Sequence, residues 1–303
     1  MLELLFDKLD ESSHSLPEQA SRLFHGRGHC YQGLSFINID WLMPVVWVVI
    51  YGEQEQLLIS KIRQYLQTLG QTNEAIQCVM LQQRLRGSVV NETVYGTVSD
   101  SCHALENGLR YELNLANNQN IGFFMDARPA RDWIQQQAEG KKVLNLFAYT
   151  CSFSVAALAG GAAEVVNIDM ARSALITGQR NHELNALAGN KARFLPHDVF
   201  RSTRKLEKLG PYELVVIDPP SRQKGSFEAD KDYGRLLARL ATMLADNAQI
   251  LACLNAPYLD EHFLPQQFAH NLPDYRLQQR LDQRPDFPEQ DLQRCLKMQV
   301  FTA

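Results

Sequence analysis

The stretch from residue 142 to residue 169, KVLNLFAYTCSFSVAALAGGAAEVVNID, constrains the fold of this chain more than any other. Two short apolar runs, 143–147 and 165–168, are typical of buried strands. Between them lie a loop of small residues and an alanine-rich segment over 153–158, which favours a helix. The second run ends at a lone acid, Asp169. This order of strand, loop, helix and strand predicts a doubly wound α/β sheet that holds a nucleoside beyond its strand ends.

The loop after the first strand indicates which cofactor this sheet could hold. A carboxylate at the tip of the second strand, at Asp169, can accept hydrogen bonds from both hydroxyls of a ribose. A helix N-terminus beside it offers unpaired backbone N–H groups. The loop is not G-x-G-x-x-G, since residues 149–153 (YTCSF) carry bulk where a dinucleotide needs bare backbone. We therefore predict a cofactor without phosphate, namely S-adenosylmethionine (SAM).

Four motifs give the chain a resemblance to a known family. They are GFFMDAR (122–128), NLFAYT (145–150), Asp169-Met170 and Asp218-Pro219-Pro220. With them, residues 118–301 resemble the class I SAM-dependent methyltransferases, in the group that includes bacterial large-subunit ribosomal RNA methyltransferases. That group typically has a Tyr-Thr-Gly loop, where this chain has Tyr149-Thr150-Cys151-Ser152. The missing glycine makes the loop tighter for the methionine part of the cofactor.

The resemblance implies a set of cofactor-binding residues. In the family, the junction around Asp126 lies over the cofactor pocket, although Asp126 could instead cap a helix with Arg128 at the surface. Asp198 follows the third predicted strand, where an acid can accept from the exocyclic amine of adenine. The predicted cofactor contacts are Phe124, Asp126, Arg128, Asn145, Phe147, Tyr149, Thr150, Cys151, Ser152, Asp169, Met170, Asp198, Val199 and Asp218.

Cys151 is of interest because it lies at a predicted helix N-terminus, a position that lowers the pKa of a thiol. A thiolate beside a sulfonium would risk being methylated itself. We interpret Cys151 as a residue that packs the cofactor loop, not as a nucleophile.

The turn Asp218-Pro219-Pro220 is the predicted catalytic element. Methyl transfer from a sulfonium needs an unprotonated nucleophile held in line with the methyl group. Two prolines after a strand force an extended turn whose backbone carbonyls cannot join the sheet. Together with the Asp218 carboxylate, these carbonyls can accept hydrogen bonds from an amine and direct its lone pair toward the methyl group. A rigid strand end with a capping aspartate is the alternative. Relatives that act on exocyclic amines often have an aromatic residue next, which stacks on the base; this chain has Ser221.

The end of the fifth predicted strand bears on which atom is methylated. Enzymes of the resembling group that make 5-methylcytosine use a cysteine nucleophile there, and this chain has Asn255. Cys253 lies two residues earlier on the same strand face, where a buried core thiol is the alternative to a catalytic one. We predict Asn255 as a catalytic residue, and a nitrogen atom as the target if the substrate is a nucleobase.

The RNA substrate is implied by the resemblance, because composition gives no sign of it. The net charge of −4 argues against a broad, non-specific grip on nucleic acid. Ser221, Arg222 and Lys224 follow the catalytic turn, where a substrate backbone would pass, so both phosphate contact and a solvated charged face are open. We expect RNA, ribosomal by resemblance. There are two alternatives. One is a methyltransferase that acts on a protein or a small molecule, and the other is a degenerate fold that serves as an RNA- or ribosome-binding module.

The rest of the sequence predicts the domain organisation. Residues 1–100 predict a small α+β domain that includes a helix over 16–31. The cluster HGRGH at residues 25–29 is interpreted as the turn that ends this helix, and contact with RNA phosphate is the other interpretation of the cluster. Residues 101–128 predict a β-hairpin junction, because they contain the hairpin signal Asn107-Gly108. Residues 129–303 predict the SAM-binding domain with its seven-stranded sheet.

Composition indicates the compartment. The longest apolar run, 41–51, is far shorter than the roughly 20 residues that a membrane-spanning helix needs. The six cysteines form no C-x-x-C pair, so neither a metal site nor a disulfide framework is predicted. These features fit a reduced, cytoplasmic protein, whose oligomeric state the sequence leaves undetermined.

Overall fold

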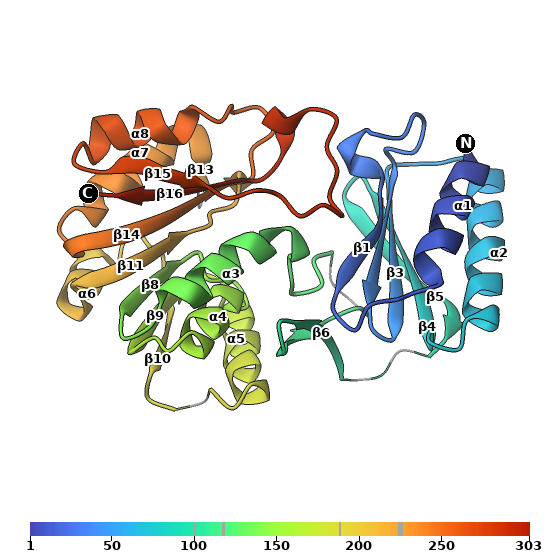
Figure 1. Cartoon of the computed structure of the whole chain (residues 1–303), viewed down its shortest axis with the longest axis horizontal. Coiled ribbons are helices and arrows are strands. Elements are labelled where there is room, and N and C mark those ends of the chain that lie inside the picture. The colour runs from blue at the N-terminus through green and yellow to red at the C-terminus, as the bar shows by residue number, and fades with distance from the viewer. Residues whose placement is uncertain (98, 100, 117–118, 188, 224–226) are drawn as a thin grey trace. The chain divides into compact units, whose positions relative to one another are not determined.

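The computed structural model describes residues 1–303 apart from 98, 100, 117, 118, 188 and 224–226. The chain forms two compact units (Figure 1). The first consists of Met1–Met125 and Arg284–Gln290, and the second of Asp126–Gln283 and Asp291–Ala303. The sequence-based boundaries differ, since they made 101–128 a separate junction and assigned 284–290 to the SAM-binding domain.

The second unit is built on the predicted seven-stranded sheet, in the order β10-β9-β8-β11-β14-β16-β15. Strand β16 runs antiparallel to both of its neighbours, and the other pairs are parallel. The doubly wound fold predicted from the sequence is confirmed. The strands are β8 (Lys142–Leu146), β9 (Glu164–Asp169), β10 (Ala192–Pro196), β11 (Tyr212–Ile217), β14 (Leu244–Leu254), β15 (Arg276–Arg280) and β16 (Lys297–Thr302), with a small ladder of β12 (Arg222–Gln223) and β13 (Phe227–Glu228).

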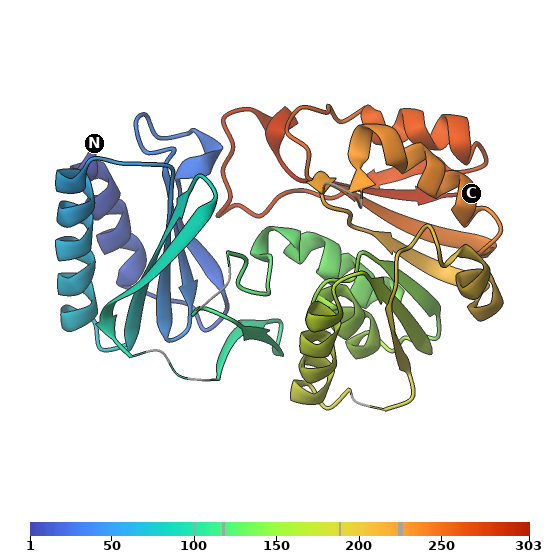
Figure 2. The same ribbon diagram turned by 180° about the vertical axis from the view of Figure 1, so that it is seen from behind.

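Helices cover both faces of this sheet because its central strands are apolar on both sides. Val143 packs against α3 and α4 in one core, whereas Leu144 and Leu146 pack with α6, α7 and α8 in another. Figure 2 shows the layers from behind. The helices are α3 (Arg128–Gln137), α4 (Ser152–Ala159), α5 (Arg172–Leu184), α6 (Thr203–Leu209), α7 (Ala229–Leu240) and α8 (Phe263–Asn271), with short 3-10 turns at η2 (Met125–Ala127) and η3 (Leu292–Arg294).

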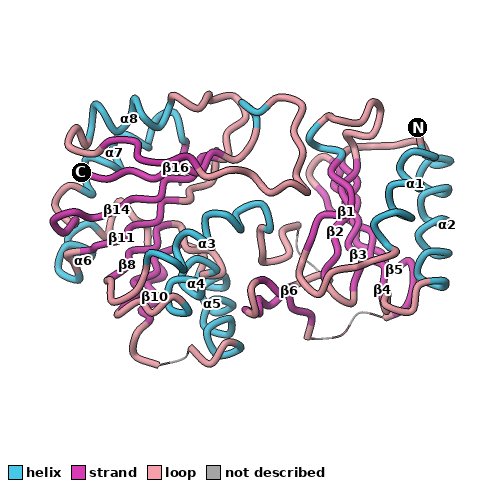
Figure 3. The backbone as a smooth tube through the Cα atoms, in the orientation of Figure 1, coloured by secondary structure: helices cyan, strands magenta, loops and turns pink. Residues whose placement is uncertain are grey.

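The first unit is a five-stranded sheet in the order β1-β2-β3-β4-β5, accompanied by two helices and a hairpin. Its core includes Trp41, Val48 and Ile62, all nearly inaccessible to solvent. The tube in Figure 3 shows α1 and α2 beside the strands. The elements are α1 (Leu2–Ser13), β1 (Ser21–His25), η1 (Gly26–Gly28), β2 (Ile37–Leu42), β3 (Val45–Tyr51), α2 (Gln56–Thr72), β4 (Cys78–Leu85), β5 (Ser88–Gly96), β6 (Cys102–Glu106) and β7 (Leu109–Leu113).

The predicted helix over 16–31 is wrong. Residues 21–25 form strand β1, which pairs antiparallel with β2, and pairing with an adjacent apolar strand outweighs weak local helix propensity. The glycines of the following turn are required by packing, since a Cβ on Gly26 would lie 2.0 Å from the carbonyl oxygen of Leu34. His25 is buried, and burial with the nearby Arg22 lowers its pKa to about 3, so it carries no charge for a phosphate.

Buried ionic contacts hold residues 284–290 in the first unit. The guanidinium of Arg284 donates to the Asp286 carboxylate (2.6 and 2.7 Å), and Asp286 also accepts from the backbone N–H of Arg22 at 2.9 Å. The Arg22 side chain in turn binds Asp40 and lies over the ring of Phe287 at 4.3 Å. Local sequence patterns do not show that residues 284–290 return to the first unit, because Arg22 and Asp286 lie more than 200 residues apart.

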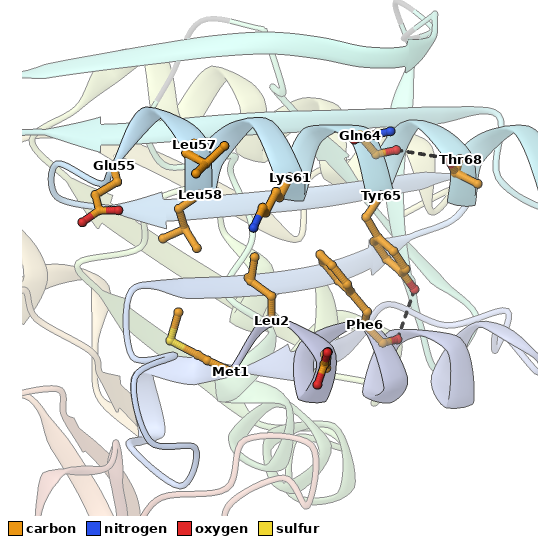
Figure 4. Close-up of a pocket in the computed structure, with 11 residues that line it drawn as sticks. Met1, Leu2, Phe6, Glu55, Leu57, Leu58, Lys61, Gln64, Tyr65 and Thr68 are labelled. Carbon is orange, nitrogen blue, oxygen red and sulfur yellow. Dashed lines mark hydrogen bonds between the residues drawn. The ribbon is translucent and has the colours of Figure 1, made fainter.

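A groove of about 720 Å³ runs between α1 and α2 (Figure 4). The rings of Phe6 and Tyr65 stack inside it with centroids 4.1 Å apart, and the Tyr65 hydroxyl donates to Asp10 at 2.6 Å. Leu57 is 66% exposed on α2.

The hairpin of β6 and β7 turns at Asn107 and Gly108, both with positive φ, as the Asn-Gly signal predicts.

Candidate active site

The candidate site lies at the carboxyl ends of the parallel strands in the second unit. The register pairs Leu146 with Ile168, Pro196 with Asp169, and Ile217 with Leu146. The ends of β8, β9, β10 and β11 therefore share one edge of the sheet, and the loops that follow them begin there. Doubly wound sheets bind their ligands in this place.

The loop after β8 has an unusual backbone. Phe147, Tyr149 and Cys151 all have positive φ values (56°, 46° and 62°), although none is glycine. The Tyr149 N–H donates to a carboxylate oxygen of Asp169 at 2.9 Å, and the Ala148 N–H donates to the Ile168 carbonyl at 3.0 Å. These contacts tie the loop to the end of β9. A strained backbone held by its surroundings is common at ligand-binding sites.

Asp169 is positioned as the sequence predicts, at the tip of β9. It is half-buried, and its second carboxylate oxygen accepts from the Ala171 N–H at 2.7 Å. Each carboxylate oxygen has two lone pairs, so both can accept further hydrogen bonds after these backbone contacts. This donor and acceptor chemistry fits a ribose diol, and the predicted contact of Asp169 with the cofactor stays a prediction.

Beyond β9 and β10 there is a cavity of about 530 Å³. Met170 is 51% exposed there and offers an apolar surface to a base. Asp198 accepts from the Arg201 N–H at 2.9 Å through one oxygen, which leaves acceptor capacity for an exocyclic amine. The cavity therefore suits the adenosine part of SAM. Its lining consists of Met170, Pro196, His197, Asp198, Arg201, Ser202 and Lys205.

Cys151 occupies the place of the glycine in the family's Tyr-Thr-Gly loop, and its side chain points away from solvent. It is completely buried beside Leu175, and its Sγ lies where a Cβ on Gly178 would come within 2.5 Å. The expectation of a lowered pKa is wrong, because burial, with Asp169 nearby, raises the pKa of this thiol well above its usual value. The Cys151 thiol is therefore not accessible to a ligand in this arrangement. The packing role is the one that the geometry supports.

We expect Gly178→Ala to lower the free energy of unfolding by about 1–3 kcal/mol, the usual effect of overpacking a filled core. The reason is the 2.5 Å approach of the new Cβ to the Cys151 sulfur. In a Cys151→Gly background the clash is absent, so most of the loss should disappear. Urea unfolding of the four proteins in this double-mutant cycle measures the coupling.

Gly234→Ala is the matched control for this cycle, since Gly234 lies on α7 and its added Cβ would meet the side chains of Gln267 and Asn271 instead. Its effect should be the same in the parent and in the Cys151→Gly background. If the effects of Gly178→Ala and Cys151→Gly on the free energy of unfolding are additive, the Cys151 side chain is not what makes an alanine at position 178 destabilising.

Asp218, at the end of β11, has a strongly perturbed carboxyl. Burial, reinforced by the nearby Asp126 carboxylate and opposed by Arg131, raises its pKa to about 7. Strongly perturbed acids in a cleft are candidates for catalysis. The structure thus brings the predicted residues Asp126 and Asp218 into electrostatic contact. Arg131, which is 2% exposed on α3, was not predicted; a buried charge on a helix has no local sequence signal.

Asn255 and Cys253, at the end of β14, differ in their exposure to solvent. Asn255 is exposed just beyond the strand, whereas Cys253 is completely buried in the core. Burial, with Asp218 and Asp126 nearby, raises the pKa of the Cys253 thiol well above its usual value, and its backbone carbonyl accepts from the Tyr233 hydroxyl at 3.2 Å. A neutral, inaccessible thiol is a poor nucleophile.

Asn145 lies beneath the crevice in a chain of buried polar groups. Its amide donates to Asn167 (2.9 Å), which donates to the Ser154 hydroxyl (3.0 Å). His182 Nδ1 donates to the Gly178 carbonyl at 2.6 Å, so its Nε2 accepts from Ser154 at 2.9 Å. Asn145 is 1% exposed. These contacts make Asn145 a support for the sheet and α4, and its contact with the cofactor stays a prediction.

The other predicted residues are distributed as follows. Phe124 falls in the first unit and is 46% exposed. Arg128 pairs with Asp132 one helical turn away at 3.6 Å. Val199 and Thr150 are buried, and Ser152 begins α4. Lys224 lies outside the described residues. The ligand contacts of these residues stay predictions.

None of the helices in the described part of the chain is long and apolar enough to span a membrane.

Comparison with solved structures supports the same fold and cofactor. A Streptococcus mutans protein assigned as a SAM-dependent methyltransferase is 26% identical, with a TM-score of 0.84, over 99% of this chain and 80% of that one. A protein assigned as a methyltransferase and crystallised with SAH, the demethylated product of SAM, is 26% identical with a TM-score of 0.82, over 98% and 78%. These likenesses extend across both units.

Curated relatives match a shorter part of the chain. Ribosomal RNA large subunit methyltransferase K/L of Shewanella sp. (strain MR-4) is 37% identical over 153 residues, which are 48% of this chain and 22% of that protein. Ribosomal RNA large subunit methyltransferase I of Aeromonas salmonicida (strain A449) is 39% identical over 116 residues, 38% and 29% of the two chains. The matches therefore span less than a third of these relatives.

A family model extends the match to almost the whole chain. It describes a S-adenosylmethionine-dependent methyltransferase and covers residues 21–302. The sheet order and the crevice at its strand ends agree with that assignment. The protein belongs to the S-adenosylmethionine-dependent methyltransferase family, and its cofactor is SAM.

Proposed function

We propose that this protein transfers the methyl group of SAM to a base of ribosomal RNA. The RNA substrate is supported by one observation above all, the likeness of its catalytic part to relatives named as ribosomal RNA large subunit methyltransferases. The exposed Arg222 just after the catalytic turn supplies a cation for a phosphate. A ribosomal substrate also implies that the protein works in the cytoplasm.

In this proposal, different residues at the strand ends bind different parts of SAM. In the proposal, Asp169 accepts from the ribose hydroxyls, Asp198 accepts from the adenine amine, and Met170 covers the base. The loop over 147–152 surrounds the methionine part with its backbone. SAM supplies a methyl group activated by the sulfonium charge, and the protein needs only to orient the substrate towards it.

Asp218 has the properties of a proton acceptor for a nitrogen target. With a pKa of about 7, it is partly ionised at neutral pH and can accept a hydrogen bond or a proton from the attacking nitrogen. The carbonyls of Pro219 and Pro220 add acceptors beside it. A nitrogen lone pair directed in this way needs no covalent help from the enzyme, whereas carbon 5 of a pyrimidine does.

We therefore expect Asn255→Ala to lower the methyl-transfer rate more than Cys253→Ser does. The exposed amide of Asn255 can hydrogen-bond a base edge, and the Cys253 thiol is buried and protonated. Single-turnover rates with both variants, checked for folding by thermal denaturation, measure the difference. A covalent complex with 5-fluorocytosine RNA that is lost in Cys253→Ser would instead identify Cys253 as the nucleophile and carbon as the target.

Mass spectrometry of ribosomal RNA nucleosides from a deletion strain and its parent tests the function itself. One methylated base should be missing in the deletion strain, and the purified protein should restore it on that strain's RNA with radiolabelled SAM. Label that appears in protein or small molecules would favour the other substrate classes. Absence of SAM binding would favour an RNA- or ribosome-binding module.

A further inference from the structure

Ser221 follows Asp218-Pro219-Pro220 in the sequence, and an aromatic side chain from another part of the chain contacts its backbone. Tyr258 lies in the loop between β14 and α8, close in sequence to Asn255. Its hydroxyl donates to the backbone carbonyl of Ser221 at 3.3 Å. The phenol is therefore hydrogen-bonded to the residue where related enzymes with an exocyclic-amine substrate often have an aromatic side chain.

The ring itself is available for contact. Tyr258 is 56% exposed, one of the few large apolar side chains of the second unit with such access. Within the residues that the structure describes, it stacks on no other aromatic ring and takes no cation on its face. Its hydrogen bond to Ser221 is made through the hydroxyl at the edge of the ring and covers neither face. A flat apolar ring held at one end is suited to stacking on another flat ring.

The backbone on both sides of this contact is itself held. The Ser221 carbonyl also accepts from the Ala229 N–H at 3.1 Å, which begins α7, and the Leu259 N–H donates to the Ala256 carbonyl at 3.0 Å. Tyr258 thus connects the loop after β14, to which it belongs, with the turn after β11. In the register of the sheet, these two strand ends are neighbours, with Ile217 opposite Ala252.

We propose that Tyr258 stacks on the base that is methylated and so selects a planar, nitrogen-bearing ring as the substrate. This inference rests on the proposed function, because it requires an RNA base to enter the crevice. The ring would hold the base against the turn at Asp218 while the amide of Asn255 contacts its edge. The role is one of substrate positioning and does not involve the transferred methyl group.

Tyr258→Ala is expected to weaken RNA binding by about 5- to 150-fold, the range expected for losing one base–aromatic stack. Tyr258→Phe keeps the ring and loses only the hydrogen bond to Ser221, so it should stay within about threefold of the parent. SAM affinity should be unchanged in both variants. Leu57→Ala, at an exposed apolar residue of α2 in the first unit, is the control for a general loss of apolar surface.

The measurements are RNA binding to the protein with SAH present, KM and kcat for methyl transfer to RNA from the deletion strain, and SAM affinity by calorimetry. If the parent methylates no RNA, the proposed function fails and this inference with it. If the parent methylates RNA and Tyr258→Ala binds it equally well, only the stacking role fails. Equal losses in Tyr258→Phe and Tyr258→Ala would overturn it too, since they would assign the effect to the hydroxyl and the loop.

Discussion

Replacing Asp218 with asparagine should lower the methyl-transfer rate by a factor on the order of 100, typical of one positioned proton acceptor. The carboxyl lies at the end of β11, where burial and Asp126 raise its pKa to about 7. Asparagine keeps the shape and one acceptor oxygen but cannot take a proton. The parent rate should rise with pH and level off above about pH 7, whereas the variant should show no such step. Affinity for SAM should remain within a few-fold of the parent.

Thermal stability separates this effect from misfolding. The folded-state pKa of Asp218 is raised above its ordinary value of 3.8, so the folded protein favours the protonated carboxyl. The stability that this provides is complete below pH 3.8 and is lost as the pH rises through about 7. Asp218→Asn has no charge to bury, so its melting temperature should match the parent's in acid and exceed it above pH 7. A variant that is more stable at pH 8 but transfers methyl groups as fast as the parent would exclude Asp218 from catalysis.

Replacing Asp169 with alanine should weaken SAM binding by about 2 kcal/mol or more, as for the loss of charge-assisted hydrogen bonds, which is roughly 30-fold. The structure adds a second cause. The carboxylate also accepts from the backbone N–H groups of Tyr149 and Ala171, so alanine releases the loop over 147–152 that we propose surrounds the cofactor. Calorimetric titration with SAM and with SAH measures the loss.

Asp169→Asn and Asp198→Ala are useful companions to this variant. The asparagine keeps one acceptor for the loop and should therefore recover part of the affinity, and Asp198→Ala should remove only a contact to the adenine amine, with a smaller loss. A folded Asp169→Ala protein with unchanged SAM affinity would show that the ribose is held elsewhere.

The repeating pattern of apolar runs was enough to predict the sheet of the second unit. Strands β8 and β9, the alanine-rich α4 and the acid at Asp169 follow one another within 28 residues, so their order is readable from local hydrophobicity. The Asn107-Gly108 turn was predictable for a similar reason, since its conformation depends on the two residues themselves. Strand β1 was not, because a short edge strand is stabilised by β2 and not by its own sequence.

Only the tertiary structure decided the chemistry of the site. It placed Cys151 against Gly178, 27 positions away, so a thiol that local sequence suggested was activated is buried and protonated. It surrounded Asp218 with Asp126 and Arg131, and it brought the Tyr258 hydroxyl to Ser221. Burial and electrostatic coupling depend on neighbours in space, and folding brings these residues together from separate helices, strands and loops. The sequence therefore determined the type of fold and its cofactor, and the packing of distant segments determined the burial and protonation of the candidate site residues.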